Sequence, residues 1–417
     1  QSVWQSIHNP IVRDTIMSGL GIPDIINYKY YNSKTETKRY AIRDFHNLGI
    51  KRRLIKSTTK PGSTLLDVSV GKGGDIPKWV NSSLGFVVGI DVNRDNIENR
   101  IDGACARYLK MKQKNKSTPL GIFLNGNSEL NIKTGVAFSD EKHKNIMKSL
   151  LGNGPKDKHK IGSVVYDNYG RFKDGFDVVS CQFSIHYFFK NKVTLSGFLK
   201  NISDMCKVNG YFIGTCYDGK RLFKLLQDIN RGECISKHVN NKKMCEIIKD
   251  YERDEFNDDS SSLGYAIKVY QESINDSFTE YLVNFDYLTM ELEKYGFKLL
   301  TVSELKQINL PSSVTSFKTI FEEIQQKTQI NKSLIKNYGN SIKLNKDEQF
   351  ISFLNNMFVF KKIEVVTVDP GVIEPENVFG ETETPVKPLH DEKKPLKKKK
   401  KKKKLGKVVM LDDEETN

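Results

Sequence analysis

A glycine-rich turn between two apolar runs constrains this chain more than any other feature. The first run, residues 65–70, ends at a glycine cluster that begins at Gly71, and the second run, residues 86–90, ends at Asp91. Glycine lets a backbone turn sharply and approach a ligand closely, and a helix that follows points its first amides at the same ligand. An acid at the end of the second strand suits ribose hydroxyls. The segment therefore predicts a strand, a turn, a helix and a second strand, laid out as a nucleoside-cofactor site.

Apolar runs alternate with helical periodicity over most of the chain. Strands are predicted at residues 120–124, 176–183, 211–216 and 357–360, and helices at residues 41–55, 93–113 and 193–206. Further strand or helix signals lie at residues 264–271, 286–295, 297–303, 315–327 and 346–354. This alternation favours an α/β fold, with a mostly parallel sheet and helices on both faces.

Breaks in this pattern predict the domain organisation. Residues 1–40 are expected to be an amino-terminal arm or linker, and residues 41–362 a single folded domain. Residues 131–173 are rich in Gly, Lys and Asp and are expected to be an inserted loop region, and residues 230–262 a mobile polar loop. After residue 362 periodicity ends, so residues 363–417 are expected to be a disordered Lys-rich tail.

The charge of the chain is concentrated in its folded part. The net charge is +15, yet residues 363–417 contain 12 lysines and 12 acids, so the whole excess lies in residues 1–362. A basic folded body favours a polyanionic partner, and nucleic acid is the commonest one. The lysine run at residues 397–404 is open to three interpretations: a nuclear signal, a nonspecific RNA tether or a solvated tail.

Composition also narrows the cellular setting. Six cysteines lack CxxC spacing, which favours reduced thiols in a cytosol-like compartment and no metal site. No apolar run approaches the roughly 20 residues that a membrane helix needs. The chain does not begin with Met, so we expect it to be a piece of a longer polypeptide. The expected location is cytoplasmic, including a viral replication site or virion, and the lysine run leaves the nucleus open.

A second cluster of polar and aromatic residues follows another strand. It contains Gln182, Phe183, His186 and Tyr187. The carboxyl ends of parallel strands meet at one edge of a sheet, so this cluster should lie beside the glycine turn. Its rings could stack on a flat, positively charged heterocycle, although ordinary core packing is the alternative for the phenylalanines. The glycine spacing fits neither GxGxxG nor a P-loop, which disfavours nicotinamide and nucleoside triphosphatase chemistry.

Together these motifs resemble those of mRNA cap guanine-N7 methyltransferases. The resemblance covers roughly residues 41–362 and rests on three segments: residues 71–79, 177–187 and 210–215. It implies a class I S-adenosylmethionine-dependent methyltransferase fold, with S-adenosylmethionine as cofactor and capped RNA as substrate. Residues 4–10 are similar to the segment that joins guanylyltransferase to methyltransferase in multifunctional capping enzymes of large DNA viruses. That similarity implies guanylyltransferase and triphosphatase domains elsewhere in the same polypeptide.

The resemblance also implies which residues bind the cofactor. Lys51 would meet the methionine carboxylate, Asp67 and Gly71 would hold the methionine portion, and Asp91 would bind the ribose. The remaining positions of the cofactor wall are Ser69, Asn127, Gln182, Phe183 and Tyr187. Two of these depart from the family pattern: Ser69 replaces a glycine, and Asn127 stands where an aspartate near the adenine is usual.

Substrate positions follow in the same way. His186 and Glu280 would hold the guanine, since a carboxylate can accept the N1 and N2 hydrogens, and together with Tyr187 they are the residues expected to be catalytic. The other cap or RNA positions are Asn47, Lys72, Lys78, Arg107 and Asn355. Asn355 replaces a tyrosine of cellular members, which predicts a weaker grip on guanine.

The implied reaction needs no general base, because guanine N7 carries a free lone pair. Alignment and electrostatics would then supply the catalysis. A ribose 2′-O-methyltransferase is a rival, but it would need a lysine placed with carboxylates to activate a hydroxyl. A second alternative is a catalytically weak or inactive methyltransferase-fold subunit that binds RNA in a capping complex. A third is nonspecific RNA binding through the lysine tail alone, with steep salt dependence.

Overall fold

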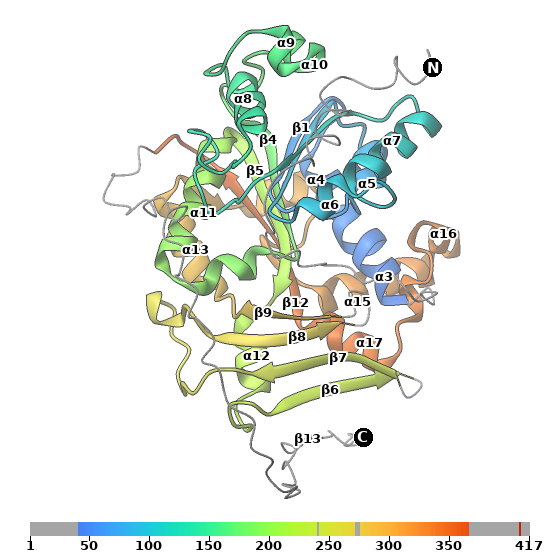
Figure 1. Ribbon diagram of the computed structural model, residues 1–417. Coiled ribbons are helices and arrows are strands. Elements are labelled where there is room, and N and C mark those ends of the chain that lie inside the picture. The colour runs from blue at the N-terminus through green and yellow to red at the C-terminus, as the bar shows by residue number, and fades with distance from the viewer. Residues whose placement is uncertain (1–40, 240–241, 272–275, 367–407, 410–417) are drawn as a thin grey trace, which may run out of the picture.

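A long mixed sheet forms the centre of the molecule (Figure 1). The computed structural model describes residues 41–239, 242–271, 276–366 and 408–409. Strands follow the order β10-β12-β5-β4-β1-β2-β3, with β11 on β12. Pairs from β5 to β3 are parallel, whereas β12 runs antiparallel to β5, β10 and β11. The bounds are β1 Thr64–Asp67, β2 Phe86–Asp91, β3 Leu120–Asn125, β4 Phe176–Gln182, β5 Cys206–Tyr217, β10 Phe297–Leu299, β11 Val314–Ser316 and β12 Asn355–Lys362.

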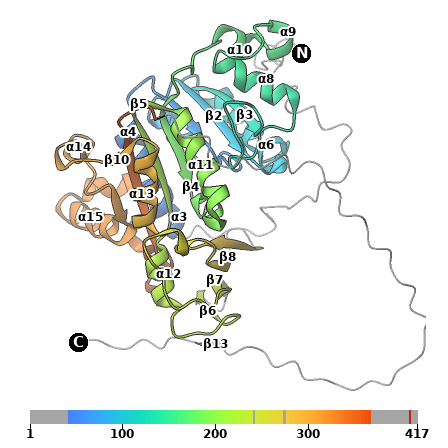
Figure 2. The ribbon, with the colours of Figure 1, turned by 90° about the vertical axis from the view of Figure 1, so that its left-hand side faces the viewer.

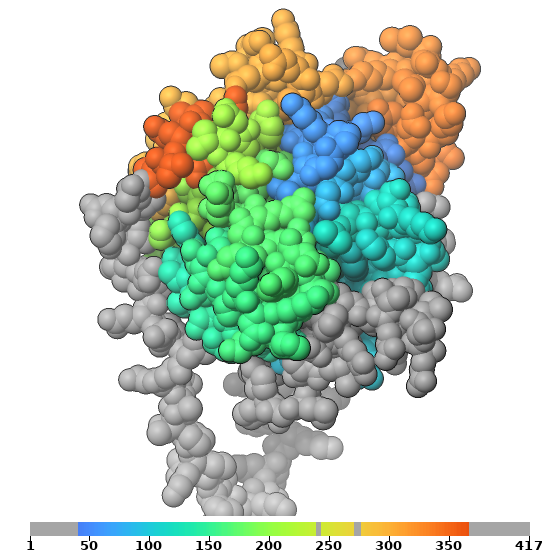
Figure 3. All heavy atoms as spheres, turned by 90° about the horizontal axis from the view of Figure 1, so that it is seen from above, coloured from blue at the N-terminus to red at the C-terminus, as the bar shows by residue number. Residues whose placement is uncertain are grey.

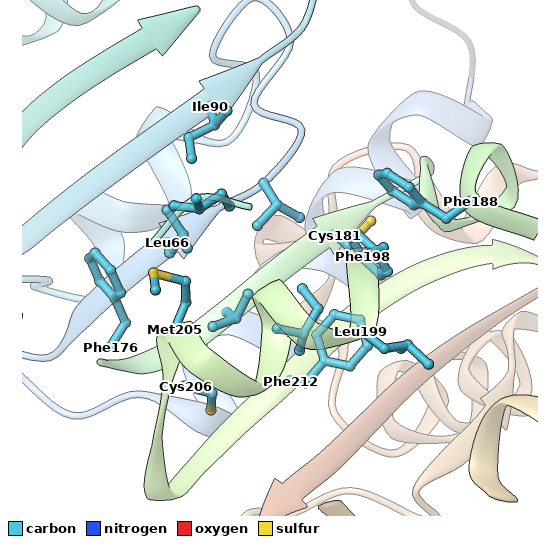
Figure 4. Close-up of a cluster of buried hydrophobic side chains, with 14 of the residues drawn as sticks. Leu66, Ile90, Phe176, Cys181, Phe188, Phe198, Leu199, Met205, Cys206 and Phe212 are labelled. Carbon is cyan, nitrogen blue, oxygen red and sulfur yellow. The ribbon is translucent and has the colours of Figure 1, made fainter. Parts of the chain in front are cut away.

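Helices cover both faces of this sheet (Figures 1 and 2). One face packs against α3 (Ala41–Asp44), the π-helix η1 (Phe45–Lys51), α4 (Arg52–Thr58), α5 (Ile76–Asn81), α7 (Ala104–Lys114) and α15 (Phe317–Ile330). The other packs against α8 (Glu141–Leu150), α11 (Lys192–Met205) and α13 (Phe285–Lys294). Figure 4 shows Leu66, Phe176, Leu199 and Phe212 in this second layer, where apolar side chains from strands and α11 interdigitate. The expected α/β architecture and the strands at β3, β4, β5 and β12 are confirmed.

Two helical predictions need adjustment. The helix expected at residues 93–113 is two helices, α6 (Arg94–Glu98) and α7, separated by a turn that ends at Gly103. The spacing of Ile101 would place it on the apolar face of a single helix over residues 93–113, but it lies in this turn and is exposed. Residues 41–55 are helical, but through a π-helix in the middle. No helix in the described part of the chain is long and apolar enough to cross a membrane.

The prediction of an inserted loop region at residues 131–173 is wrong, because the segment forms helices. It contains α8, α9 (Lys158–Ile161) and α10 (Ser163–Asp167), which form the lobe between β3 and β4 coloured green in Figure 3. Ile146, Met147 and Leu150 of α8 are fully buried in the main core. The segment is polar on average, but its few apolar residues gather on one helical face, and burial of that face orders it.

Strands of a second sheet occupy residues 234–239 and 242–249 of the loop expected at residues 230–262, whereas residues 250–262 contain no strand. Strands β6 (Cys234–Val239), β7 (Lys242–Lys249), β8 (Ala266–Gln271) and β9 (Asp276–Tyr281) pair antiparallel in that order, and β13 (Val408–Val409) pairs with β6. Ile235, Ile247 and Val269 pack on one face into a small core of their own. A sheet with one buried face needs an apolar residue only at every second position, so a polar sequence can still form strands. The expected arm and nearly all of the expected tail lie outside the described residues.

Candidate active site

The change in strand order places the candidate site between β1 and β4. The chain leaves β1 towards β2 and β3, and leaves β4 towards β5 on the other side. At such a switch point a crevice opens beyond the carboxyl ends of the parallel strands. Asp67, Asp91 and Gln182 are the last residues of β1, β2 and β4. The three predicted cofactor positions therefore converge on one crevice.

The glycine turn is held by the acid that ends β2. The Gly71 amide donates to Asp91 Oδ2 at 2.8 Å, and Asp91 Oδ1 accepts from the Asn93 amide at 2.9 Å and from Asn96 Nδ2 at 3.1 Å. Burial raises the pKa of Asp91, although these hydrogen bonds oppose the shift. A carboxylate oxygen has more than one lone pair, so Asp91 keeps acceptor capacity for a ribose hydroxyl.

The two neighbouring glycines of this turn offer a direct test. Gly73 has φ +69°, and a Cβ there would lie 2.7 Å from Ile76 Cδ1, whereas Gly74 has no atom of the described residues within 4 Å of its Cβ position. We expect Gly73→Ala to destabilise the fold by at least about 1–2 kcal/mol and to weaken cofactor binding. Gly74→Ala should change stability by less than about 0.5 kcal/mol. Urea unfolding and S-adenosylmethionine titration measure both; equal effects of the two substitutions would contradict this role of the turn.

Asp67 is suited to a cationic ligand group. It is buried, and its carboxylate accepts from the Ser69 amide at 3.2 Å. Burial, together with the charges of Asp75 and Asp91, raises the pKa of Asp67 to about 8. A cation placed beside it would restore the ionised form, as the ammonium group of a methionine moiety can. Ser69 Oγ lies 3.9 Å from Cys181 Sγ, so the side chain that replaces a glycine is turned towards β4.

Four polar residues form a buried network at one side of the crevice. Asp75 lies 2.8 Å from Lys51 Nζ and 2.7 Å from Lys78 Nζ, and Lys78 Nζ donates to Asn47 Oδ1 at 2.7 Å. Although burial acts to raise the pKa of Asp75, the two lysines hold it well below its usual range. Burial lowers the pKa of Lys78 to about 8. The structure thus joins a predicted cofactor residue, Lys51, to two predicted cap residues through Asp75.

His46 and Asp75 are site residues that the sequence analysis missed. The His46 ring stacks on Phe183 at 5.4 Å, and its Nε2 lies 2.8 Å from Ser352 Oγ. Phe183 has φ +57° and lies under Lys51 Nζ, 6.0 Å from its ring centroid. Burial and the charge of Lys51 lower the pKa of His46 to about 3, so the ring is neutral. The only sequence signal for Asp75 was its position directly after the glycine cluster. Nothing in the sequence pattern indicated His46.

His186 and Glu280 form a pair that is unusual for a protein interior. His186 lies on the 3₁₀ helix η2 (Ile185–Lys190) after β4, and Glu280 lies on β9 of the second sheet, with Nε2 and Oε2 3.7 Å apart. Within the described residues, both His186 nitrogens and Glu280 Oε2 are buried without a hydrogen-bond partner. Burial lowers the pKa of His186 to about 3 and raises that of Glu280 to about 8. Unsatisfied buried groups of this kind are typical of a ligand site.

Aromatic and polar residues surround this pair. The Tyr187 ring meets the His186 ring edge to face at 4.3 Å. Asn355 is buried, donates from Nδ2 to the main-chain oxygens of Ile351 and Ser352, and leaves Oδ1 without a partner in the described structure. Gln182 is held by Thr215 Oγ1, which donates to its Oε1 at 3.1 Å. Gln182 ends β4 and Asn355 begins β12, the two strands on either side of β5.

The remaining predicted residues lie further along the sheet. Lys72 pairs with Asp102, in the turn before α7, at 2.9 Å and with Asp95 of α6 at 3.6 Å, and Arg107 is exposed on α7. Asn127 follows β3, and its Oδ1 accepts from the Glu129 amide at 3.0 Å. The neighbouring Ser128 donates to the main-chain oxygen of Val68, which ties this loop to the one after β1. The ligand roles of these residues stay predictions.

The strand order, the glycine turn and the acids that end β1 and β2 define a class I S-adenosylmethionine-dependent methyltransferase. The sequence profile of the mRNA (guanine-N(7))-methyltransferase domain matches residues 25–363. The chain belongs to this family, which confirms the resemblance, the enzyme class and S-adenosylmethionine as the cofactor.

Individual relatives agree. The chain is 27% identical over 412 residues to a protein named "Probable mRNA-capping enzyme" from Acanthamoeba polyphaga mimivirus, covering 91% of this chain and 33% of that protein. It is 24% identical over 368 residues to the mRNA cap guanine-N(7) methyltransferase of Saccharomyces cerevisiae, covering 85% of this chain and 72% of the yeast protein. The structure is also similar to that of a solved S-adenosylmethionine-dependent methyltransferase from Clostridium acetobutylicum. The match covers 77% of this chain and 91% of that chain, at 11% sequence identity and a TM-score of 0.40. The fold assignment therefore rests on the strand order.

Proposed function

We propose that this chain transfers a methyl group from S-adenosylmethionine to N7 of the guanine in the GpppN cap of mRNA. The observation that carries the proposal is the unsatisfied His186–Glu280 pair beside the cofactor crevice. Guanine presents N1 and N2 hydrogens to an acceptor and the O6 lone pairs to a donor, which leaves the N7 lone pair for the methyl group. An acid and a neutral imidazole offer one acceptor and one donor, so they are complementary to that base.

Each residue has a role that its surroundings support. Lys51 and Asp67 would bind the carboxylate and ammonium of the methionine moiety, and Asp91 the ribose. The cofactor supplies a methyl group already activated on a sulfonium. The N7 lone pair forms the new bond as the carbon–sulfur bond breaks, and no proton has to leave. Positive charge then resides on guanine. This charge would favour the ionised form of the buried Glu280, and the carboxylate and the Tyr187 ring would stabilise the cation in turn.

A labelling experiment tests this proposal. With labelled S-adenosylmethionine and GpppA-capped RNA, nuclease digestion should release the label in 7-methylguanosine. Label in 2′-O-methyladenosine would instead support the ribose methyltransferase. Absence of label, with normal cofactor binding, would support the inactive RNA-binding subunit. Glu322 is an exposed residue of α15 and is not one of the candidate site residues. Glu322→Gln is therefore a matched control that should keep full activity.

We infer that the chain is the methyltransferase part of a longer capping polypeptide that also carries guanylyltransferase and triphosphatase domains. The chain spans a third of the length of the mimivirus relative, whose name covers the whole capping activity, and this supports the inference. A cytoplasmic or viral replication site is the location we propose. Mass spectrometry of the native polypeptide and imaging of a tagged chain would test both.

A further inference from the structure

A cavity of about 680 Å³ lies on the far side of β12 from the candidate guanine site. It is enclosed by α12 (Gly219–Leu225), α13, α14 (Val302–Gln307), β10, β11 and the start of β12. Figure 2 shows α13 and α14 on the same side of the molecule, with α12 below them. Its apolar walls are Phe285, Leu299, Leu300, Leu305 and Val314. The walls suit a flat, apolar ligand face.

The floor of this cavity carries an unsatisfied acceptor. Asn356 lines the cavity and is only 3% exposed. Its Nδ2 donates to Asp218 Oδ2 at 2.9 Å, and its Oδ1 has no hydrogen-bond partner among the residues that the structure describes. Because consecutive strand residues point to opposite faces, Asn356 faces away from Asn355. A ligand that donates a hydrogen bond to Oδ1 would satisfy this buried acceptor.

The lining of the cavity has one more basic than acidic side chain: Lys220, Arg221 and Lys224 against Asp218 and Asp286. Lys220 lies 2.6 Å from both Asp258 and Asp286, so its charge is neutralised. The Arg221 side chain donates to the main-chain oxygen of Phe353 at 2.9 Å. Lys224 is exposed, and in the described part of the chain it has no ion pair or side-chain hydrogen bond. Lys224 is therefore the cation of the lining that remains available to an anion.

We propose that this cavity binds one nucleotide of the RNA body downstream of the cap. The base would lie between the apolar walls and donate an N–H to Asn356 Oδ1, and a phosphate would meet Lys224. Every RNA base carries an N–H on its Watson–Crick edge, so the site accepts any sequence. The inference rests on the proposed function, because a capped substrate held near Asn355 would bring RNA close to the start of β12, where Asn356 lines the cavity. The +15 charge of the chain supports a polyanionic ligand over an apolar peptide.

The test compares GpppA with a capped single-stranded RNA of about ten nucleotides, long enough to span one such site. Lys224→Glu and Asn356→Leu should each raise the Kd for the capped RNA roughly tenfold, while methylation of GpppA stays at the wild-type rate. Lys298→Glu is the matched control, since Lys298 leaves β10 on the face opposite to Leu299. It should leave the Kd for RNA within about twofold.

Unchanged RNA affinity in both variants, with wild-type melting temperatures, overturns the proposal. Titration with AMP separates the two sources of a nucleotide: if AMP binds the cavity while RNA affinity stays unchanged, a free nucleotide is the ligand and the RNA assignment is wrong. If wild type binds RNA through Lys224 yet does not methylate GpppA, the proposed function fails, whereas methylation of GpppA with RNA affinity that does not depend on Lys224 overturns only this inference.

Discussion

The Glu280→Gln variant is expected to lose N7 methylation by about 10²–10³-fold while it stays folded. Glutamine keeps the shape of the side chain but cannot carry the negative charge that would stabilise a methylated, cationic guanine. Its amide can also present a donor where guanine N1 and N2 present donors. Single-turnover methylation of GpppA at saturating cofactor measures the loss. Activity at the wild-type rate would exclude Glu280 from the site.

The same substitution, although it lowers activity, should raise the free energy of unfolding relative to the wild type as the pH rises. Burial raises the pKa of Glu280 in the fold to about 8 from an ordinary value of 4.5. A carboxyl with a raised folded-state pKa contributes stability that is present below about pH 4.5 and is lost as the pH rises to about 8. Between these values the wild type should lose stability relative to Glu280→Gln, which has no charge to bury. Urea unfolding of both proteins at about pH 5 and about pH 8 tests this, and parallel pH profiles would contradict the burial of an uncompensated carboxyl.

Asp75→Asn is expected to lower the free energy of unfolding by about 3–5 kcal/mol and to weaken both cofactor and cap binding. The substitution leaves Lys51 and Lys78 close together without the carboxylate that bridges them at 2.8 and 2.7 Å. Because the pKa of Lys78 in the intact network is about 8, Lys78 is charged below that pH in the wild type, and the loss of its carboxylate partner should be largest there. Urea unfolding and S-adenosylmethionine calorimetry give the two readouts.

A surface pair provides the control for this prediction. Asp204 lies 3.3 Å from Lys200 on α11, and both side chains are partly exposed. Asp204→Asn should change stability by less than about 1 kcal/mol. Equal losses for Asp75→Asn and Asp204→Asn would show that the Asp75 network is an ordinary surface pair and does not position the site.

The large sheet could be predicted from the sequence because its strands are buried on both faces. Continuous apolar runs such as residues 86–90 read as buried strands without further information, and the glycine cluster marks the turn after β1. The second sheet could not be predicted in this way. Its strands have one solvated face, and β6 and β7 mix the buried Ile235 and Ile247 with polar residues such as Lys237, Lys243 and Glu246, so their average polarity is that of a loop.

The candidate site, like the fold, could be predicted from the sequence only in part. Asp67, Asp91 and Gln182 could be placed together because strand ends in a parallel sheet share an edge. The pairing of His186 with Glu280 came from the family resemblance alone, since no local pattern links residues so far apart in the sequence. The roles of Asp75 and His46 depend on packing between η1, α5 and β4, and only the folded structure brings these elements into contact.

The pair proposed to hold guanine joins the two sheets: His186 follows β4 of the large sheet, and Glu280 lies on β9 of the small one. The candidate cofactor residues, by contrast, belong to the large sheet and the helices beside it. The small sheet therefore carries one of the two residues proposed to hold the base and none of the residues proposed to hold the cofactor. Exchange of β8 and β9 for those of another enzyme could redirect the acceptor base without rebuilding the donor half, which makes the small sheet the natural module for engineering methylation of other purines.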